Sequence, residues 1–434
     1  MFKLRMFLIG FVILFSSSLA MSAGSELPVN GTAKTKGAGG AALATINDSS
    51  SVFINPAGLA YVKGTQIQGG FGALFNHVKY TPTGYPKETS DFDLNPLPTF
   101  GFATDMFASS KYAPVSLGFF LSPSNVLRNE YDVQRSNSYQ VQPNDNNSSG
   151  VYKAVFYGLE AAPALAVKLT DNLALGFAAR FGWIYLGLDN DQTNQPGDFI
   201  SDEDYYGFYQ SWRLGAQWHP TTEDWLNNLH VGFVFRMLSQ TDLHGTFRLR
   251  YNGGPPPNET EVDTLLMDLP LQVGLGFAYD LAPEWRVMLD TFYTNTNNGN
   301  DVVFVYQQPM FGSYTSHYIR LDSKDTFKLH AGTEFDMNDW WTLRGGYTFD
   351  MRVVGDLAVN RALYDADRHV FGFGTGLEFK ELPLVGDSIS QVDLDLAFEF
   401  GFSERTIAVG GPYIAPGDYD QQSYNIEFLL TAHL

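Results

Sequence analysis

The stretch VDLDLAFEFGFS, residues 392–403, alternates apolar residues with acidic or small ones along its whole length. The apolar side chains from Val392 to Phe402 form one face, and acidic and small side chains form the other. A period of two is that of a β-strand with two different faces. Residues 271–281 and 327–336 repeat the pattern. A half-buried strand of a soluble sheet alternates in the same way, so the number of such strands and their connections must decide the fold.

Fourteen stretches of the chain fit the strand pattern. They span residues 65–76, 99–107, 114–122, 152–168, 172–190, 205–218, 229–239, 267–281, 284–297, 325–336, 340–352, 368–379, 391–403 and 422–434. The connections alternate between short turns and long loops; the long loops cover residues 123–151, 190–204, 240–266, 298–324, 353–367 and 404–421. An even strand number with short turns at one end and long loops at the other is typical of outer-membrane barrels with both termini in the periplasm. The sequence therefore predicts an all-β fold, a 14-stranded antiparallel transmembrane β-barrel.

The composition of the 434-residue chain excludes several classes of function. Charged residues make up 17% and aromatic residues 15%, and the formal net charge is -20. Because phosphate binding needs a basic surface, this acidic balance argues against nucleic acid as a partner. The chain has no cysteine, which excludes disulfides, thiol chemistry and cysteine-ligated metals.

The N-terminus has the pattern of a secretory signal peptide. Lys3 and Arg5 precede an apolar run, and small residues follow it, which predicts a signal peptide over residues 1–20 with cleavage after Ala20 or Ala23. The apolar run is too short for a membrane anchor, the alternative interpretation. We expect the protein in the cell outer membrane of a Gram-negative bacterium, as a multi-pass barrel.

The segment before the first strand does not fit the strand pattern. It is rich in glycine, alanine and serine and continues into VFINPAGLA, residues 52–60. Fourteen strands enclose more space than their own side chains fill, since eight strands already enclose a filled interior. We therefore expect residues 24–62 to form an N-terminal hatch, or plug, in the lumen, and residues 63–434 to form the barrel.

Four stretches resemble the FadL/TodX family of outer-membrane transporters. They are GAGGAALATINDSSSVFINPAGLA (37–60) and residues 269–294, 325–350 and 365–379, in the family's order. The resemblance implies uptake of long-chain fatty acids or related hydrocarbons by lumenal binding, hatch movement and lateral release into the membrane. We expect no enzymatic activity, no cofactor and no metal. The expected partners are a hydrophobic small molecule and the lipid and lipopolysaccharide of the outer membrane, and we expect a monomer.

The hatch motif supplies the first candidate site residues. Asn55, Pro56 and Ala57 match the family's hatch tripeptide, and with Gly58 they form either a turn that fixes the plug or a purely structural turn. The glycines at positions 37, 39 and 40 permit flexing or simply close packing (Gly37, Gly39 and Gly40).

Ligand-binding candidates lie in the hatch and on the inner faces of strands. The apolar candidates are Phe53, Ile54, Leu59, Leu186 and Leu188. Inward-facing arginines can bind a fatty-acid carboxylate, or they can pair with inward acidic residues. The arginine candidates are Arg180, Arg213, Arg236 and Arg344. The run Asp365, Asp367 and Arg368 matches a family motif and either holds a loop, contacts a carboxylate or forms a loop salt bridge.

Other functions remain as alternatives. A barrel of this family can serve as a secretion-machinery or surface interaction component, and a general porin would conduct polar solutes. An enzyme would need a catalytic motif, but the eight histidines are scattered and no Gly-x-Ser-x-Gly or His-Glu-x-x-His occurs. The loops 190–204 and 240–266 are short and polar, unlike the apolar capture loops of some family members.

Overall fold

The computed structural model describes most of the barrel and part of the N-terminal segment. The described residues are 31–83, 87–107, 115–133, 150–192, 199–220, 225–251, 258–296, 301–310, 314–320, 323–355, 365–380, 389–407 and 416–434. The expected signal peptide and residues 24–30 of the expected hatch lie outside these ranges.

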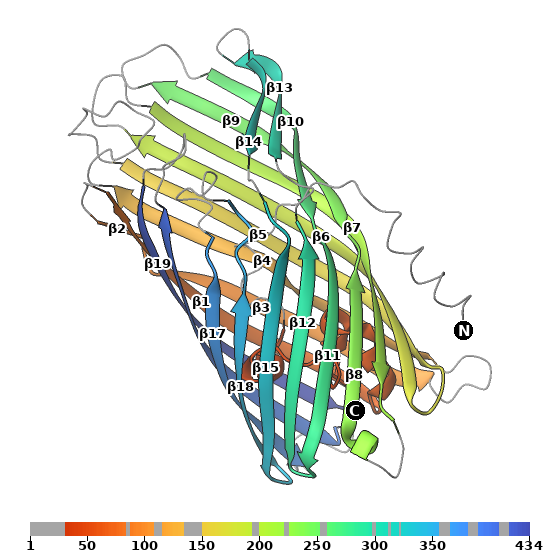
Figure 1. Ribbon diagram of the computed structural model, residues 1–434. Coiled ribbons are helices and arrows are strands. Elements are labelled where there is room, and N and C mark those ends of the chain that lie inside the picture. Colours follow the sequence, from red (N-terminus) through yellow and green to blue (C-terminus); the bar gives the residue numbers. More distant parts are fainter. Residues whose placement is uncertain are drawn as a thin grey trace, which may run out of the picture.

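The described strands form one antiparallel sheet that closes on itself (Figure 1). The strands are β1 Thr65–Pro82, β2 Glu88–Thr89, β3 Asp93–Phe107, β4 Val115–Val133, β5 Gly150–Lys168, β6 Leu173–Gln192, β7 Phe199–Trp218, β8 Leu229–Arg236, β9 Ser239–Tyr251, β10 Asn258–Leu269, β11 Leu271–Ala282, β12 Trp285–Asn295, β13 Asp301–Met310, β14 Tyr314–Arg320, β15 Thr326–Asn338, β16 Trp341–Asp350, β17 Arg368–Lys380, β18 Gln391–Ile407 and β19 Gly417–His433. Closure comes from β1, which pairs with β3 on one side and with β19 on the other.

The nineteen strand elements make fourteen wall strands, which confirms the predicted barrel. Four wall strands are interrupted, so that β8 continues as β9, β10 as β11, β12 as β13 and β14 as β15. The pairing shows this continuity, because β7 pairs with β8 near one end and with β9 near the other. The two-residue strand β2 lies beside β1 and adds no wall strand.

The prediction of loops over residues 240–266 and 298–324 is wrong, because most of these residues lie in β9, β10, β13 and β14. Figure 1 shows β13 and β14 at the far end of the wall, on the side that carries the long loops. In β9 the alternation is inverted, since Leu243 is buried while Asp242 and His244 on the opposite face are exposed. A strand whose outer face is polar lacks the lipid-facing signature from which the wall strands were counted.

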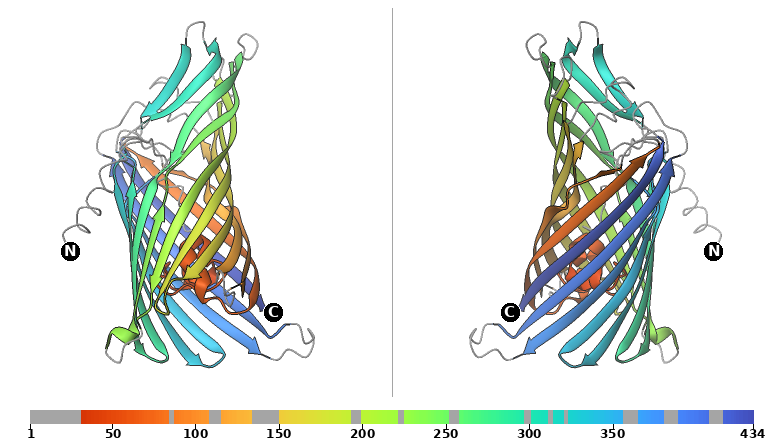
Figure 2. Two further views of the ribbon diagram at one scale, coloured as in Figure 1. Left: turned by 90° about the vertical axis from the view of Figure 1, so that its right-hand side faces the viewer. Right: turned by 90° about the vertical axis from the view of Figure 1, so that its left-hand side faces the viewer.

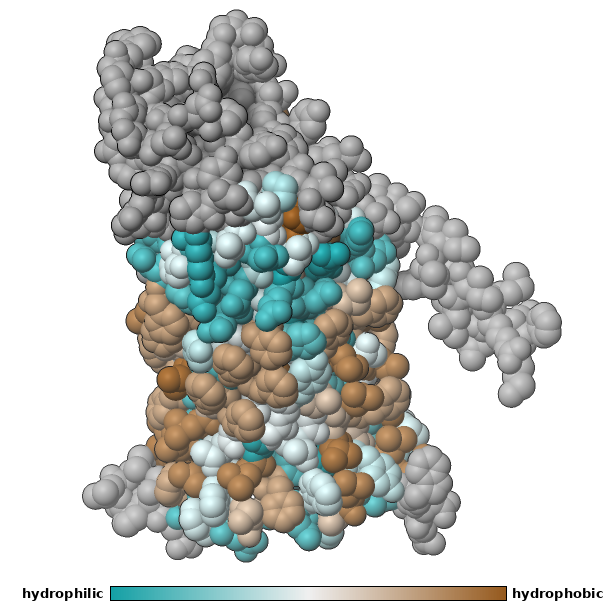
Figure 3. Space-filling model, turned by 60° about the vertical axis from the view of Figure 1, so that its left-hand side comes forward, coloured by the Kyte–Doolittle hydropathy of each residue, from teal (hydrophilic) through white to brown (hydrophobic). Residues whose placement is uncertain are grey.

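The two faces of the wall have opposite polarity. Outward side chains such as Phe71 and Ile426 are half exposed, at 50% and 56%, whereas the inward Glu427 is 1% exposed. Figure 3 shows the outward apolar side chains as a band, with a polar zone above it on the side of the long loops. An apolar outer band with a polar interior is the arrangement of a transmembrane β-barrel. Among the described residues, no helix is long and apolar enough to cross a membrane.

Residues 31–62, here called the lumenal segment, lie inside the barrel. The segment contains α2 Ala33–Gly37, α3 Ser51–Ile54 and the 3-10 helix η1 Pro56–Tyr61. Figure 2 shows these short helices enclosed by the strands in both views, nearer the end with the short turns and the C-terminus. Gly39 and Gly40 have φ values of 63° and 80°, a left-handed conformation that glycine adopts without strain and that ends α2.

Candidate functional site

Glycines on the inner faces of the wall strands let the backbone of the lumenal segment approach the wall. A Cβ atom added at any of them would lie closer than 3 Å to an atom of the segment. These inner glycines are Gly101, Gly118, Gly176, Gly215, Gly232, Gly276, Gly332, Gly346, Gly372 and Gly374. At Gly176 the Cβ would lie 2.2 Å from the carbonyl carbon of Pro56. The wall is therefore shaped to hold the segment at backbone distance, on most sides of the barrel.

Asn55 makes three hydrogen bonds through its side chain inside the barrel. It is 0% exposed. Its Nδ2 donates to the carbonyl oxygens of Leu43 at 2.8 Å and Ala216 at 3.0 Å, and its Oδ1 accepts from the Ala57 N–H at 3.2 Å. Asn55 therefore begins η1, with Pro56 at its first position, and ties two parts of the segment to β7. Ala57 and Gly58 follow within the same buried turn.

Replacing Asn55 with alanine is expected to loosen the lumenal segment from β7. The change leaves buried carbonyls of Leu43 and Ala216 with fewer donors, which costs about 2 kcal/mol. The chain has no cysteine, so a Ser51→Cys reporter, at a position that is 0% exposed, can be followed by maleimide labelling. We expect labelling about thirtyfold faster. Lys63→Ala, at the exposed position that directly follows the segment, is the control and should leave the rate unchanged; equal rates for both variants would contradict the assignment.

Other wall residues hold the first half of the segment by its backbone. Asp290 Oδ2 accepts from the N–H groups of Ala42 at 2.7 Å and Leu43 at 2.9 Å. Gln217 Nε2 donates to the carbonyl oxygens of Leu43 and Ile46, both at 3.1 Å. These bonds satisfy buried backbone groups that regular secondary structure leaves open.

A buried ion pair joins α2 to the wall. The Lys36 ammonium contacts Glu427, and the two side chains are 3% and 1% exposed. Glu399, on the neighbouring strand, lies close enough to Lys36 to interact electrostatically and accepts from Asn425 Nδ2 at 2.7 Å. One ammonium of the segment thus faces two wall carboxylates. A buried charge with no counter-charge is costly, so this pair fixes the position of α2.

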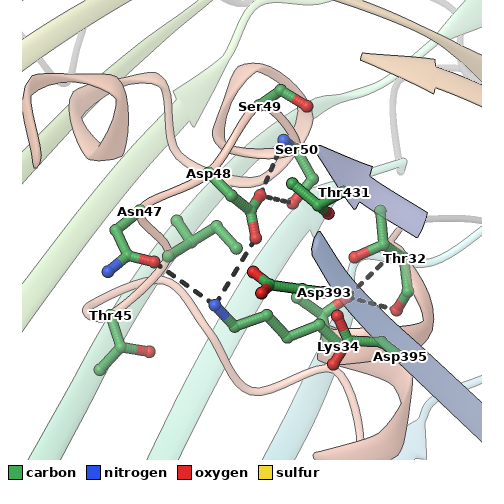
Figure 4. Close-up of polar contacts among 12 residues, drawn as sticks. Thr32, Lys34, Thr45, Asn47, Asp48, Ser49, Ser50, Asp393, Asp395 and Thr431 are labelled. Carbon is green, nitrogen blue, oxygen red and sulfur yellow. Dashed lines mark hydrogen bonds and ion pairs between the residues drawn. The ribbon is translucent and has the colours of Figure 1, made fainter. Parts of the chain in front are cut away.

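A second lysine of the segment lies in a more open acidic environment, shown in Figure 4. Lys34 Nζ contacts Asn47 Oδ1 at 3.4 Å and Asp48 Oδ2 at 3.6 Å, with Asp393 and Asp395 beside it. Burial lowers the pKa of Lys34, but the carboxylates of Asp48 and its neighbours outweigh this effect. The pKa therefore lies above its usual value and the ammonium stays charged.

The second half of the segment packs on the wall through apolar side chains. Leu59 is 0% exposed, and Phe53 packs its ring 5.4 Å from that of Phe120 on β4. The surrounding wall residues are alanines of β5 and β6, whose small side chains leave room for the larger ones of the segment. Ile54 is half-buried at the end of α3. Of the apolar candidates, Phe53 and Leu59 thus pack against the wall.

A second apolar cluster lines the wall on the long-loop side of the segment. The apolar lumenal cluster consists of Leu74, Leu97, Val126, Phe156, Ile184, Leu186, Tyr205, Tyr209, Leu243 and Leu269. The partly buried Leu188 packs against it. The candidates Leu186 and Leu188 therefore belong to one apolar region on one side of the lumen. The other residues of this region come from β1, β3 to β7, β9 and β10.

Three of the arginine candidates lie between this cluster and the lumenal segment. Arg180, Arg213 and Arg236 are 3%, 6% and 4% exposed, and Arg213 pairs with Arg236 across β7 and β8. Arg180 Nε donates to Glu160 Oε1 at 2.8 Å, and Tyr209 of the apolar cluster donates to the same carboxylate at 2.5 Å. These residues, with Glu160, are here called the arginine group.

Arg213 connects the arginine group to the lumenal segment. Its Nη1 donates to the Val52 carbonyl oxygen at 3.1 Å, and its guanidinium lies 5.5 Å from the centre of the Phe53 ring. Arg236 Nη2 contacts the Pro270 carbonyl oxygen at 3.5 Å. Arg180 thus pairs with Glu160, while Arg213 and Arg236 lie beside each other on β7 and β8 in the same buried region.

The fourth arginine candidate lies elsewhere. Arg344 forms ion pairs of 2.6 Å with both Glu334 and Asp395, on the far side of the lumenal segment from the arginine group. Its two carboxylate partners leave it no excess positive charge. The structure therefore does not bring Arg344 together with the other three.

The loop motif holds the chain at the long-loop end. Asp365 Oδ2 accepts from the N–H groups of Val353 at 2.6 Å and Val354 at 2.9 Å, while Asp367 accepts from the Arg352 N–H. Burial raises the pKa of Asp365 to about 6, partly offset by these two bonds. Arg368 pairs with Asp350 at 2.8 Å. The motif thus fixes the chain that enters β17.

The wall is interrupted beside the apolar lumenal cluster. The ladder between β3 and β4 ends at the pair Phe100 and Leu121, and residues 94–99 of β3 pair only with β1 in the described ladders. Pro96 and Pro98 have no N–H to donate, so this part of β3 cannot complete ladders on both sides. Leu97 and Val126 of the apolar lumenal cluster lie on the two sides of the interruption.

Sequence reasoning missed several residues of the site. Glu160, Tyr209, Gln217 and Asp290 were not singled out, because nothing in their own strands distinguishes them from other inward polar residues. Lys36 gave a usable signal, since a lysine in the glycine- and alanine-rich segment needs a carboxylate partner once buried. Among the described residues, no group of three or more His, Cys, Asp or Glu side chains could hold a metal ion.

The fold and site define the class of protein: a transmembrane β-barrel whose lumen contains an N-terminal segment beneath an apolar inner surface. The family model described as "Outer membrane protein transport protein (OMPP1/FadL/TodX)" matches residues 13–406. The chain belongs to this family, the FadL/TodX family of outer-membrane transporters of hydrophobic compounds.

Solved structures show the same fold at low sequence identity. A FadL homologue from Pseudomonas aeruginosa aligns with a TM-score of 0.75 and 16% identity, over 95% of this chain and 100% of its own. The toluene transporter TodX from Pseudomonas putida aligns with 0.72 and 16%, over 94% and 99%. The toluene transporter TbuX from Ralstonia pickettii aligns with 0.67 and 15%, over 94% and 99%. A search of curated proteins found no match.

Proposed function

We propose that this protein takes up hydrophobic compounds that carry an anionic head group, with fatty acids as the model substrates. The observation that carries the proposal is the contact between three elements: the apolar lumenal cluster, the arginine group and the lumenal segment. Tyr209 belongs to the cluster and donates to Glu160, and Arg213 donates to the Val52 carbonyl of the segment. A ligand bound to one element is therefore close to the other two.

The apolar lumenal cluster makes the entry of a hydrocarbon chain into the lumen energetically favourable. Each Å2 of apolar surface removed from water contributes about 25 cal/mol. Its side chains come from consecutive wall strands and pack together, so a hydrocarbon chain that enters between them would have apolar neighbours.

The arginine group favours a negative head group at the end of that chain. Its three guanidinium groups are buried, and a carboxylate ligand would accept charge-assisted hydrogen bonds there. A carboxylate that competes for Arg213 would weaken the bond from Arg213 to Val52. Binding and loosening of the lumenal segment are coupled in this way, which is how we infer that the segment acts as a hatch.

The interruption between β3 and β4 offers a lateral exit. The outward neighbours Leu94 and Phe100 are 51% and 45% exposed, so the interruption lies within the apolar, lipid-facing band. A hydrophobic ligand that leaves there passes from an apolar inner surface to lipid without crossing water. In this proposal the short-turn end and both termini are periplasmic, the protein acts as a monomer, and lipopolysaccharide surrounds the long-loop end.

Substitution of Arg213 tests the head-group assignment. In purified protein, Arg213→Met should weaken oleate binding about tenfold, because one charge-assisted hydrogen bond is lost. Binding of oleyl alcohol, which has the same chain and no charge, should change less than twofold. Arg248→Met, on the outer face of β9 and paired with Asp202 at 3.0 Å, is the control for loss of a charge. Equal weakening of acid and alcohol would overturn the head-group assignment, and no binding of either by the wild type would overturn the function.

A further inference from the structure

A polar arc of the wall adjoins the apolar lumenal cluster. Asn76 of β1 faces Ser423 of β19, and Asn425 lies two residues further along β19. All three side chains are buried, at 1%, 4% and 2% exposure. On β1, Asn76 lies between the buried Leu74 and Val78, and Leu74 belongs to the apolar lumenal cluster. Uncharged polar side chains therefore adjoin the apolar lumenal cluster at Asn76.

Asn76 is unusual among the buried amides of the wall. Neither its Nδ2 nor its Oδ1 has a hydrogen-bond partner among the described residues, and the same holds for Oδ1 of Asn425. A buried amide without partners costs about 1–3 kcal/mol, because it has lost its hydrogen bonds to water. On the inner face of the barrel, a molecule in the lumen can restore these bonds.

The hydrogen-bond donors and acceptors of Asn76 and Asn425 determine which chemical group of a ligand can bind there. Asn76 offers both a donor and an acceptor, and Asn425 offers an acceptor because its Nδ2 already donates to Glu399. The Glu399 carboxylate next to Asn425 would repel a second carboxylate. A hydroxyl group, which donates once and accepts twice, fits these partners.

We propose that Asn76 and Asn425 form a subsite for an uncharged hydroxyl group on the body of the ligand. The protein would thus prefer hydroxylated fatty acids to saturated ones. This inference rests on the proposed function, in which the carboxylate end binds the arginine group and the chain lies on the apolar lumenal cluster. An ordered water would satisfy the same amide groups without selecting a ligand, so the test compares ligands that differ by one hydroxyl.

The test measures binding of stearic acid and of a set of hydroxystearic acid isomers to the purified full-length protein. We expect the wild type to prefer at least one isomer about tenfold, the effect of one or two hydrogen bonds made in a buried site. Asn76→Leu should abolish this preference and leave stearate binding equal or tighter. His77→Leu, on the opposite face of β1, should preserve the preference. If Asn76→Leu does not fold, Asn76→Ala takes its place.

Each outcome separates this inference from the proposed function. If the wild type binds stearate and every isomer equally, or if the preference survives in Asn76→Leu, water alone occupies the site and the inference is wrong. If the wild type binds none of these acids, the proposed function itself fails.

Discussion

Replacing Gly176 with valine is expected to expel the lumenal segment from its place on the wall while the barrel still closes. A Cβ atom at this position would lie 2.2 Å from the carbonyl carbon of Pro56 and 2.3 Å from the Ala57 nitrogen. These are backbone atoms, so no side-chain rotation can relieve the overlap. Valine is otherwise favourable in a strand. The substitution should therefore weaken the packing of the lumenal segment against the wall and leave the stability of the wall itself unchanged.

The Ser51→Cys reporter measures this effect. Overpacking against rigid backbone costs about 3 kcal/mol, so maleimide labelling should accelerate at least about a hundredfold in Gly176→Val. Gly69→Val is the matched control, because a Cβ at Gly69 of β1 meets nothing within 4 Å. Labelling that stays slow in Gly176→Val, with the barrel folded, would show that the segment does not depend on close approach to the inner glycines.

The second large effect is expected for Lys36→Met. The substitution removes the ammonium that faces Glu427 and Glu399 inside the barrel and leaves two buried carboxylates close together. Loss of one partner of a buried pair costs about 3–5 kcal/mol. We expect the midpoint of urea unfolding to fall strongly at neutral pH and to recover in part at acidic pH, because protonation removes the repulsion between the carboxylates.

Two further variants separate charge from packing in this experiment. Lys34→Met removes the other lysine of α2, whose side chain is 31% exposed and 3.6 Å from Asp48, and should cost less than about 1 kcal/mol. Adding Glu427→Gln to Lys36→Met should restore part of the lost stability, since it removes one of the unpaired charges. A Lys36→Met variant as stable as Lys34→Met would mean that the buried pair does not hold the segment.

The alternation of residues was enough to predict the barrel and its fourteen wall strands. It was not enough beyond the apolar band, where the outer face of a strand is polar and the signal inverts, as at Asp242 and His244 of β9. The interruptions within wall strands also had no distinct signal, except at Pro270, which separates β10 from β11. The alternation of apolar and polar residues arises because the outward side chains contact lipid. It therefore stops where a strand extends beyond the membrane.

The candidate site could be predicted only residue by residue. The alternation within its strand predicts that Arg180 points into the lumen. Its partner Glu160 lies on the neighbouring strand, and only the register between the two strands brings the two side chains together. Asn55 was identified from its motif, whereas its contact with the Ala216 carbonyl spans 161 positions of the chain. Such long-range contacts depend on how the strands align, which local sequence does not specify.

The proposed function is tested most directly by measuring the uptake of labelled oleate in a Gram-negative host that lacks its own fatty-acid transporter and expresses this protein. We expect uptake above that of cells without the protein, and a slower rate with Arg213→Met at equal expression. No uptake by the wild type, together with a protein partner that co-purifies in stoichiometric amount, would contradict it and favour a secretion-machinery component.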